Sequence, residues 1–147
     1  MSRGVLLVFF VSLIAYAIPS HTGATVLITT DEAKLPAAAS EKSRGIRPRV
    51  TIEQISPQRD AGVKSPVHLI VKFTPHNETS VDLSTLKVFY LKQPLIDLTD
   101  RIAPYASKAG IDMPNAEIPP GTHLIRFRLT DSQGSWAAGT ITLIVLR

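Results

Sequence analysis

Apolar and polar residues alternate in short stretches over the C-terminal two thirds of the chain. In the clearest stretch, 123–130, Ile125, Phe127 and Leu129 stand at every second position, with arginines between them. A period of two predicts a strand with one face in the core and the other in water. No long segment has the 3.6-residue apolar period of an amphipathic helix. The pattern therefore predicts an all-β protein.

Turn-forming residues divide this region into segments of the length expected for strands. Prolines recur roughly every nine or ten residues, and proline marks edges and turns because it cannot donate to a sheet ladder. Ile55 is out of phase with Val50 and Ile52, which indicates a bulge or a change of sheet. The expected architecture is an antiparallel β-sandwich of about seven strands. We expect these strands over Arg49–Ile55, Val67–Phe73, Leu86–Lys92, Ile96–Leu98, Ala116–Ile118, His123–Thr130 and Trp136–Leu146, with a helical turn over Ile102–Ala109.

The first 24 residues have a different pattern. Arg3 precedes an apolar stretch, Val5–Ile18, of about 14 residues, which is shorter than the roughly 20 that a membrane-spanning helix needs. A basic start, a short apolar core and small residues beyond it are typical of a secretory signal peptide. Cleavage is expected before Thr25 or before Ile18, with an uncleaved membrane anchor as the alternative. The mature protein is therefore expected to be periplasmic or secreted, without stable membrane insertion.

Residues 25–48 separate the signal peptide, 1–24, from the expected sandwich, 49–147. Thr25–Thr30 has the composition of a short strand, and a stretch rich in alanine and then a basic run follow it. This segment is expected to be a flexible arm or an extra strand. No aromatic residue lies within the basic run to stack on bases, so we favour a solvated linker and expect no nucleic-acid partner. The run contains Lys42, Arg44, Arg47 and Arg49.

Three segments within the expected sandwich carry a resemblance to a known family. They are Ser65–Phe73, a strand with a proline before it; the link Pro119–His123, which reads Pro-Pro-Gly-Thr-His; and the turn Thr130–Gly134, which reads Thr-Asp-Ser-Gln-Gly. Together they resemble the immunoglobulin-like sandwich domains of bacterial secreted and surface proteins. The resemblance implies an immunoglobulin-like fold and a role as a spacer or binding module. Cysteine is absent and Trp136 opens the last strand, so the antibody subclass is excluded.

Composition and motifs argue against an enzyme. The chain has 147 residues, a formal net charge of +4 and no cysteine. The lack of cysteine excludes disulfides, a thiol nucleophile and metal sites built on thiolates. A nucleophile elbow and a glycine-rich phosphate loop are also missing from the sequence. We therefore expect neither catalytic residues nor a cofactor.

A periplasmic carrier of copper or calcium is the alternative function. The four histidines have no close pairing, and they are expected at the surface as ordinary side chains. Periplasmic copper-binding proteins with an immunoglobulin-like fold resemble this chain in Val67–Phe73, but they carry a histidine at the mature N-terminus. For calcium, the spacing of the aspartates lacks the ligands required, and Asp131 is expected to form a turn. Asp97 and Asp100 are expected to pair with Arg101 or to cap a turn.

The remaining hypothesis is a binding surface for an unidentified protein or envelope component. Phe89 and Leu91 lie in opposite phase to the core positions of their strand, and Ile70 is expected near them if the two sheets align. An exposed apolar patch of this kind would suit a partner. The alternative is that Thr25–Thr30 covers the patch as an extra strand. The sequence thus predicts an exported, non-enzymatic, immunoglobulin-like binding or structural module with Ile70, Phe89 and Leu91 as its partner-binding face.

Overall fold

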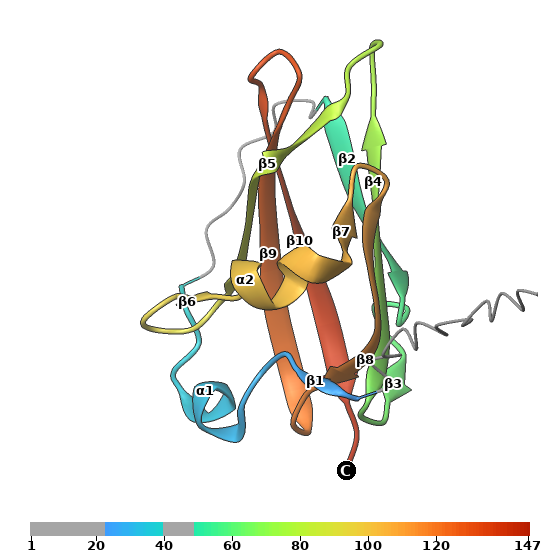
Figure 1. Cartoon of the computed structure of the whole chain (residues 1–147). Coiled ribbons are helices and arrows are strands. Elements are labelled where there is room, and N and C mark those ends of the chain that lie inside the picture. Colours follow the sequence, from blue (N-terminus) through green and yellow to red (C-terminus); the bar gives the residue numbers. More distant parts are fainter. Residues whose placement is uncertain (1–22, 40–48) are drawn as a thin grey trace, which may run out of the picture.

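Two β-sheets face each other in the computed structural model, which describes residues 23–39 and 49–147 (Figure 1). Most of the expected signal peptide lies outside the described residues. Lys42, Arg44 and Arg47 of the basic run also lie outside them. Within those ranges no helix has the length and apolar character that crossing a membrane requires. The strands are β1 (Thr25–Val26), β2 (Val50–Ser56), β3 (Gly62–Val63), β4 (Val67–Pro75), β5 (Val81–Tyr90), β6 (Ile96–Asp97), β7 (Ala106–Ser107), β8 (Gly110–Glu117), β9 (Gly121–Asp131) and β10 (Trp136–Val145); the helices are α1 (Thr30–Lys34), α2 (Thr99–Ile102) and the 3-10 turn η1 (Ala103–Tyr105).

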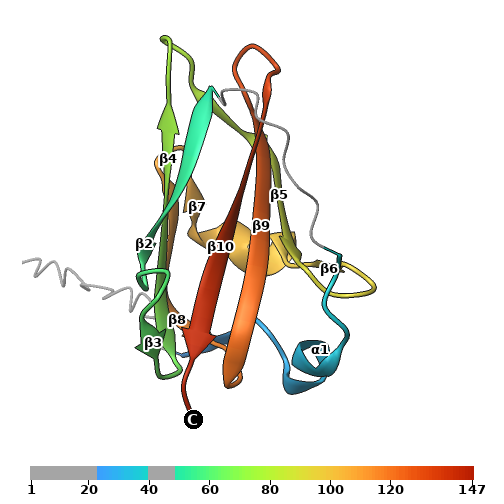
Figure 2. The same cartoon turned by 180° about the vertical axis from the view of Figure 1, so that it is seen from behind.

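The strands form two 5-stranded sheets, seen from both sides in Figures 1 and 2. Sheet 1 has the order β1-β8-β4-β2, with β7 paired to β8. Sheet 2 has the order β3-β10-β9-β5-β6. The long strands pair antiparallel, while the short β1 and β3 each run parallel to their neighbours. The prediction of an all-β protein with two sheets is confirmed.

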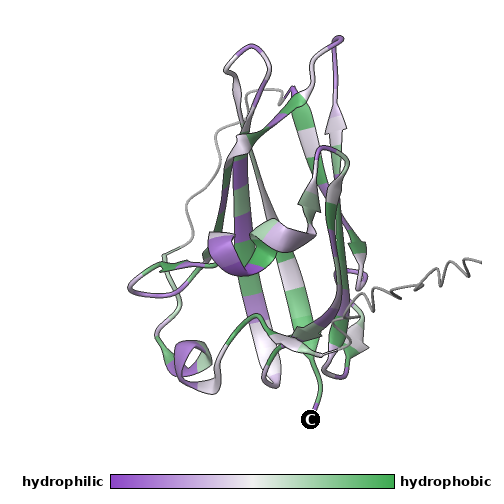
Figure 3. Ribbon diagram, viewed as in Figure 1, coloured by the Kyte–Doolittle hydropathy of each residue, from purple (hydrophilic) through white to green (hydrophobic). Residues whose placement is uncertain are grey.

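Alternate side chains of the long strands fill the space between the sheets, and Figure 3 shows the corresponding alternation of apolar and polar residues. On β9, Ile125, Phe127 and Leu129 are fully buried, as the period of two predicts. Phe127 meets Phe73 of the opposite sheet edge to face, with ring centroids 6.5 Å apart. The expected bulge near Ile55 is also confirmed, because the pairing of β2 with β4 shifts register between Gln54 and Ser56.

Two neighbouring segments between positions 99 and 118 differ from the sequence prediction. The expected short strand Ala116–Ile118 is the end of a longer strand, β8, which begins at Gly110. Pro114 hid this strand, because proline usually excludes a position from a paired strand. It is accommodated at a bulge, where the β4 pairing shifts between Val67 and Leu69. The expected helical turn at 102–109 lies earlier, as α2 and η1.

Residues 25–39 are packed into the sandwich. The segment crosses the lower end of both sheets in Figure 1 and carries β1 and α1. Leu27 and Ile28 belong to the hydrophobic core, with exposed fractions of 0% and 2%. Only Thr25–Val26 forms a strand, and it adds to sheet 1 beside β8. The core of the domain therefore needs side chains from before position 49.

Between β2 and β10, the side chain of Gln54 makes backbone hydrogen bonds of the kind that a neighbouring strand would make. The amide of Gln54 donates to the carbonyl of Thr142 at 2.7 Å and accepts from its N–H at 3.0 Å. This exchange satisfies backbone groups of β10 that no neighbouring strand reaches. Gly139 allows β2 to approach β10 here, since an added Cβ would lie 2.7 Å from the Cβ of Ile52.

Candidate binding surface

On the outer face of sheet 2, the pairing of β5, β9 and β10 aligns side chains in rows that run across the strands. Lys87 lies directly opposite Arg128, and Arg128 lies opposite Ala138. In the next row, Phe89 lies opposite Arg126. These residues and the exposed side chains at the ends of the rows form a surface that we call the cationic face: Lys87, Phe89, Leu91, Leu95, Arg126, Arg128, Trp136 and Ala138.

Like charges are neighbours on the cationic face. Lys87 and Arg128 form a direct cross-strand pair, and Arg126 projects to the same side two residues along β9. Like charges that lie directly opposite each other on neighbouring strands destabilise a sheet. The outer face of sheet 1 is arranged differently: Glu53 lies opposite Lys72, and His68 Nε2 makes a 2.7 Å hydrogen bond with Asp112 Oδ1.

A hollow of about 390 Å³ opens on the cationic face. Its wall is partly apolar and partly cationic, and the exposed Leu95, with 57% of its surface free, stands at its border. Beyond it, Trp136 is 61% exposed, and the guanidinium of Arg128 lies 5.1 Å from its ring centroid. The residues that line the hollow are Ala38, Ala39, Phe89, Leu91, Lys92, Gln93, Leu95, Arg126 and Arg128.

The structure brings together two of the three residues expected to bind a partner. Phe89 and Leu91 both line the hollow on sheet 2. Ile70 lies on β4 in sheet 1, beside Ile55 and Asp112 in a separate hollow of about 520 Å³. A single face with all three residues does not form, because the outer faces of the two layers of a sandwich point away from each other.

The segment before position 40 borders this surface rather than covering it. The expectation that Thr25–Thr30 covers Phe89 and Leu91 as a strand is wrong, because Thr25 and Val26 pair with β8 in sheet 1. Instead, Ala37 forms a bridge with Lys92, and the N–H of Ala38 donates to the carbonyl of Leu91 at 3.1 Å. The hollow therefore has a wall from before position 40 and a floor from sheet 2.

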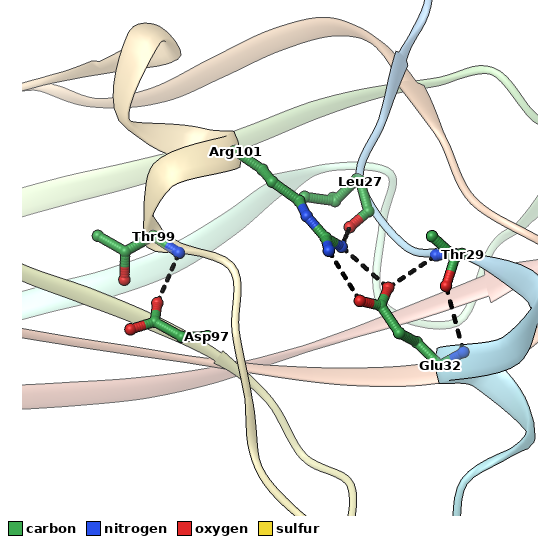
Figure 4. A network of polar contacts seen from close by, with 6 residues as sticks. All are labelled: Leu27, Thr29, Glu32, Asp97, Thr99 and Arg101. Carbon is green, nitrogen blue, oxygen red and sulfur yellow. Dashed lines mark hydrogen bonds and ion pairs between the residues drawn. The ribbon is translucent and has the colours of Figure 1, made fainter.

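An ion pair fixes this segment against α2, as Figure 4 shows. Arg101 donates from its two terminal nitrogens to the two carboxylate oxygens of Glu32, at 2.7 and 2.9 Å. It also donates to the carbonyl of Leu27 at 2.8 Å. Glu32 completes a capping box with Thr29 at the start of α1. Asp97 and Asp100 were expected to pair with Arg101 or to cap a turn, and Asp97 takes the second role, because it accepts from the Thr99 N–H at the start of α2.

The pKa values of this pair follow from its hydrogen bonds. Chiefly because Glu32 accepts from the Arg101 guanidinium, the pKa of the Glu32 carboxyl is lowered to about 2. The same contact raises the pKa of Arg101. Both groups therefore stay charged over the physiological range, and their bidentate geometry makes this a strong polar contact between residues 25–39 and α2.

Tyr90 and His123 form a buried polar pair next to Lys92. His123 Nε2 donates to the carbonyl of Pro119 at 2.8 Å, so in the neutral ring Nδ1 accepts from the Tyr90 hydroxyl, also at 2.8 Å. Burial lowers the pKa of His123 and, with a smaller effect from Glu32, raises the pKa of Tyr90 to about 12. Lys92 lies over the Tyr90 ring and donates to the carbonyls of Ala33 and Leu35, both at 2.9 Å.

His123 contradicts the expectation that the histidines lie at the surface, since it is 2% exposed. The signal was present in the sequence, because His123 has the same phase as the buried positions of β9. His68 and His76 are exposed and lie apart in the fold. Within 23–39 and 49–147, no three histidine or acidic side chains gather in a way that could hold a metal ion.

Asp131 has the turn-forming role expected from the sequence. Its Oδ1 accepts from the N–H groups of Gln133 and Ser135, at 2.9 and 2.8 Å. The side chain is buried at the end of β9, where these bonds order the turn into β10. Its role is thus to order the β9–β10 hairpin near Trp136 on the cationic face.

The Glu32–Arg101 pair predicts how stability depends on pH. As pH falls below about 4.5, the unfolded Glu32 carboxyl binds a proton before the folded one, so the contribution of the pair is complete above this pH and is lost as pH falls toward 2. The side chains of Arg101 and Glu32 are 34% and 18% exposed, so screening by solvent reduces this contribution to about 2 kcal/mol. Glu32→Gln should lower the free energy of unfolding by this amount at pH 7 and flatten the curve below pH 4.5, as measured by urea denaturation.

Asp31→Asn is the matched control, because Asp31 is the preceding acid on α1 and its side chain is 95% exposed. Its only ion pair among the described residues is with the exposed Lys34. The control should change the free energy of unfolding by less than about 0.5 kcal/mol. Equal losses from the two variants would contradict the role given to Glu32.

Comparisons with protein-family models, with curated proteins and with solved structures found no match. The described residues define a two-sheet, all-β domain whose outer faces differ in charge pattern, since Lys87 lies opposite Arg128 on sheet 2 and Glu53 lies opposite Lys72 on sheet 1.

Proposed function

We propose that this chain is an exported, non-enzymatic module of immunoglobulin-like fold that binds an envelope component or another protein through the cationic face. The observation that carries the proposal is the direct pairing of Lys87 with Arg128 next to a hollow with exposed apolar walls. A sheet face that only meets water has no need of clustered like charges, which cost stability. Positions that break such a local rule are expected at functional sites, where a ligand offsets the cost.

The immunoglobulin-like assignment and the export are parts of the same proposal. The first is supported by the two packed sheets together with the resemblance of Ser65–Phe73, Pro119–His123 and Thr130–Gly134. The second is supported by the apolar stretch Val5–Ile18 after Arg3. Mass spectrometry of the protein from fractionated cells tests export: a first residue of Thr25 or Ile18 is expected in the fraction outside the cytoplasm, and recovery of the protein only from the cytoplasm with an intact N-terminus would contradict it.

Position-specific crosslinking tests the binding surface. A photoreactive amino acid would replace Leu95 at the hollow, or Ile55 on the outer face of sheet 1, in cells that export the protein. The two positions are matched controls, because both side chains are apolar and they are 57% and 44% exposed. We expect a crosslinked product from position 95 and little from position 55.

Arg128→Gln should reduce the product from position 95, because it removes one cation from the centre of the cationic face. A circular dichroism spectrum identical to that of the unsubstituted protein shows that the variant is folded. Equal products from positions 95 and 55, or no product from 95, would contradict the proposed function.

A further inference from the structure

We infer that the partner segment held by the cationic face is an acidic stretch of protein with an apolar side chain, laid across β5, β9 and β10. This inference rests on the proposed function and names the chemistry of its partner. The evidence is the combination of charge and apolar surface in one hollow, together with the contrast between the two outer faces of the sandwich.

Charge complementarity determines the sign of the partner. Three cations, Lys87, Arg126 and Arg128, project from two neighbouring strands, and Lys92 lies at the edge of the hollow. Asp97 on β6 lies opposite Phe89, and the pKa of its carboxyl is lowered chiefly by its hydrogen bonds with Thr99, with a smaller contribution from the nearby Lys87. Carboxylates from a partner would separate Lys87 from Arg128 and remove their repulsion, so binding recovers free energy that the unbound sheet loses.

The apolar residues determine the class of the partner. Phe89, Leu91 and Leu95 line the same hollow as Arg126 and Arg128, and apolar walls of this kind bury an apolar side chain. A nucleic acid would instead stack its bases on open aromatic faces. The ring of Trp136 has the Arg128 guanidinium over it, so that face is already occupied. A peptide that carries both carboxylates and a leucine would pair with the cations and would bury its apolar side chain against the apolar wall of the hollow.

The arrangement of sheet 2 favours an extended segment. Arg126 and Arg128 are two residues apart on one strand, so they follow the pleat of the sheet. Ala138, opposite Arg128, presents only a methyl group and so adds little bulk to this row of side chains. An extended peptide with acids on one side can lie over these rows, with its apolar side chain in the hollow beside Leu95.

Titration with synthetic peptides tests the inference, with isothermal calorimetry for the affinity and Trp136 fluorescence as a local signal. Trp136 is the one tryptophan of the chain. The probe is a short peptide in which glutamates alternate with leucines and serines. The comparison ligands are the same peptide with lysines for glutamates, the same peptide with serines for leucines, and heparin as a polyanion without apolar groups.

We expect saturable binding of the glutamate–leucine peptide, no binding of the lysine peptide and about tenfold weaker binding of the other two ligands. Arg128→Gln and Leu95→Ser should each weaken the binding about tenfold. Lys72→Gln and Ile55→Ser, which change the outer face of sheet 1, should change it by less than about twofold. Circular dichroism confirms that each variant is folded.

The outcomes separate this inference from the proposed function. Absence of binding, or equal binding of heparin and the glutamate–leucine peptide, overturns the inference. If crosslinking at position 95 still yields a product, the cationic face remains a binding surface and only the chemistry of the partner was wrong. If crosslinking at position 95 also fails, both proposals are overturned.

Discussion

Leu27→Ala is expected to lower the free energy of unfolding by about 3 kcal/mol, which is the cost of a cavity where a fully buried leucine is truncated. Leu27 precedes the sequence-predicted sandwich by more than twenty positions, yet it is 0% exposed in the core. Its N–H donates to the carbonyl of Glu117 at 3.0 Å, so truncation leaves the backbone connection in place. The measurement is urea denaturation followed by circular dichroism.

Val26→Ala is the matched control for Leu27→Ala. The two residues are adjacent, but Val26 is 46% exposed. The control should change the free energy of unfolding by less than about 0.5 kcal/mol. Similar small losses in both variants would mean that residues 25–39 do not belong to the folding unit.

Gly110→Ala is expected to destabilise the fold by about 3 kcal/mol or more, since backbone strain and a steric clash act together. Gly110 has a φ of +147°, and a Cβ added to it would lie 2.0 Å from the carbonyl oxygen of Val71. Relief of this clash requires β8 to move away from β4 at the point where Gly110 pairs with Lys72. Thermal and urea denaturation measure the loss.

Gly134→Ala separates strain from clash. Gly134 also has a positive φ, +77°, but no atom lies within 4 Å of the Cβ that alanine would add. Its expected cost is about 1 kcal/mol, from the backbone conformation alone. Equal costs at the two glycines would show that β8 and β4 do not approach as closely as the structure indicates.

The strands were largely predictable because one face of each lies in the core. The phases of Ile125 on β9, Leu69 on β4 and Val88 on β5 follow directly from alternation with polar neighbours. The alternation along β9 also indicated that His123 is buried, because His123 has the same phase as Ile125. The sequence prediction placed it at the surface instead. Polar residues in a buried phase are satisfied by partners distant in sequence, here Tyr90, and alternation alone does not identify those partners.

The beginning of the domain was not predictable in the same way. Leu27 and Ile28 are adjacent, so they show no alternation, and they are buried because the chain crosses the end of the sandwich. The Glu32–Arg101 pair joins residues 69 positions apart. Such a pair depends on the tertiary fold, and local propensity carries no information about it.

The candidate surface was predictable only in part. Outward phase identified Phe89 and Leu91, but assignment of Ile70 to the same face required knowledge of which strands share a sheet. The cationic character of the face depends on register, because Lys87 and Arg128 become neighbours only through the pairing of β5 with β9. A change of register by one residue would place these cations in the core.

The central claim is that like charges on the outer face of sheet 2 are maintained for binding at a cost in stability. Ala138→Glu tests it most directly, because it adds a carboxylate opposite Arg128 without removing a cation, and Ala138→Gln is the neutral control of the same shape. At low salt, Ala138→Glu should be more stable than Ala138→Gln by about 0.5 kcal/mol, while it loses the crosslink from position 95 that the glutamine variant keeps. Equal stability of the two variants, together with an equal crosslink, would contradict the account.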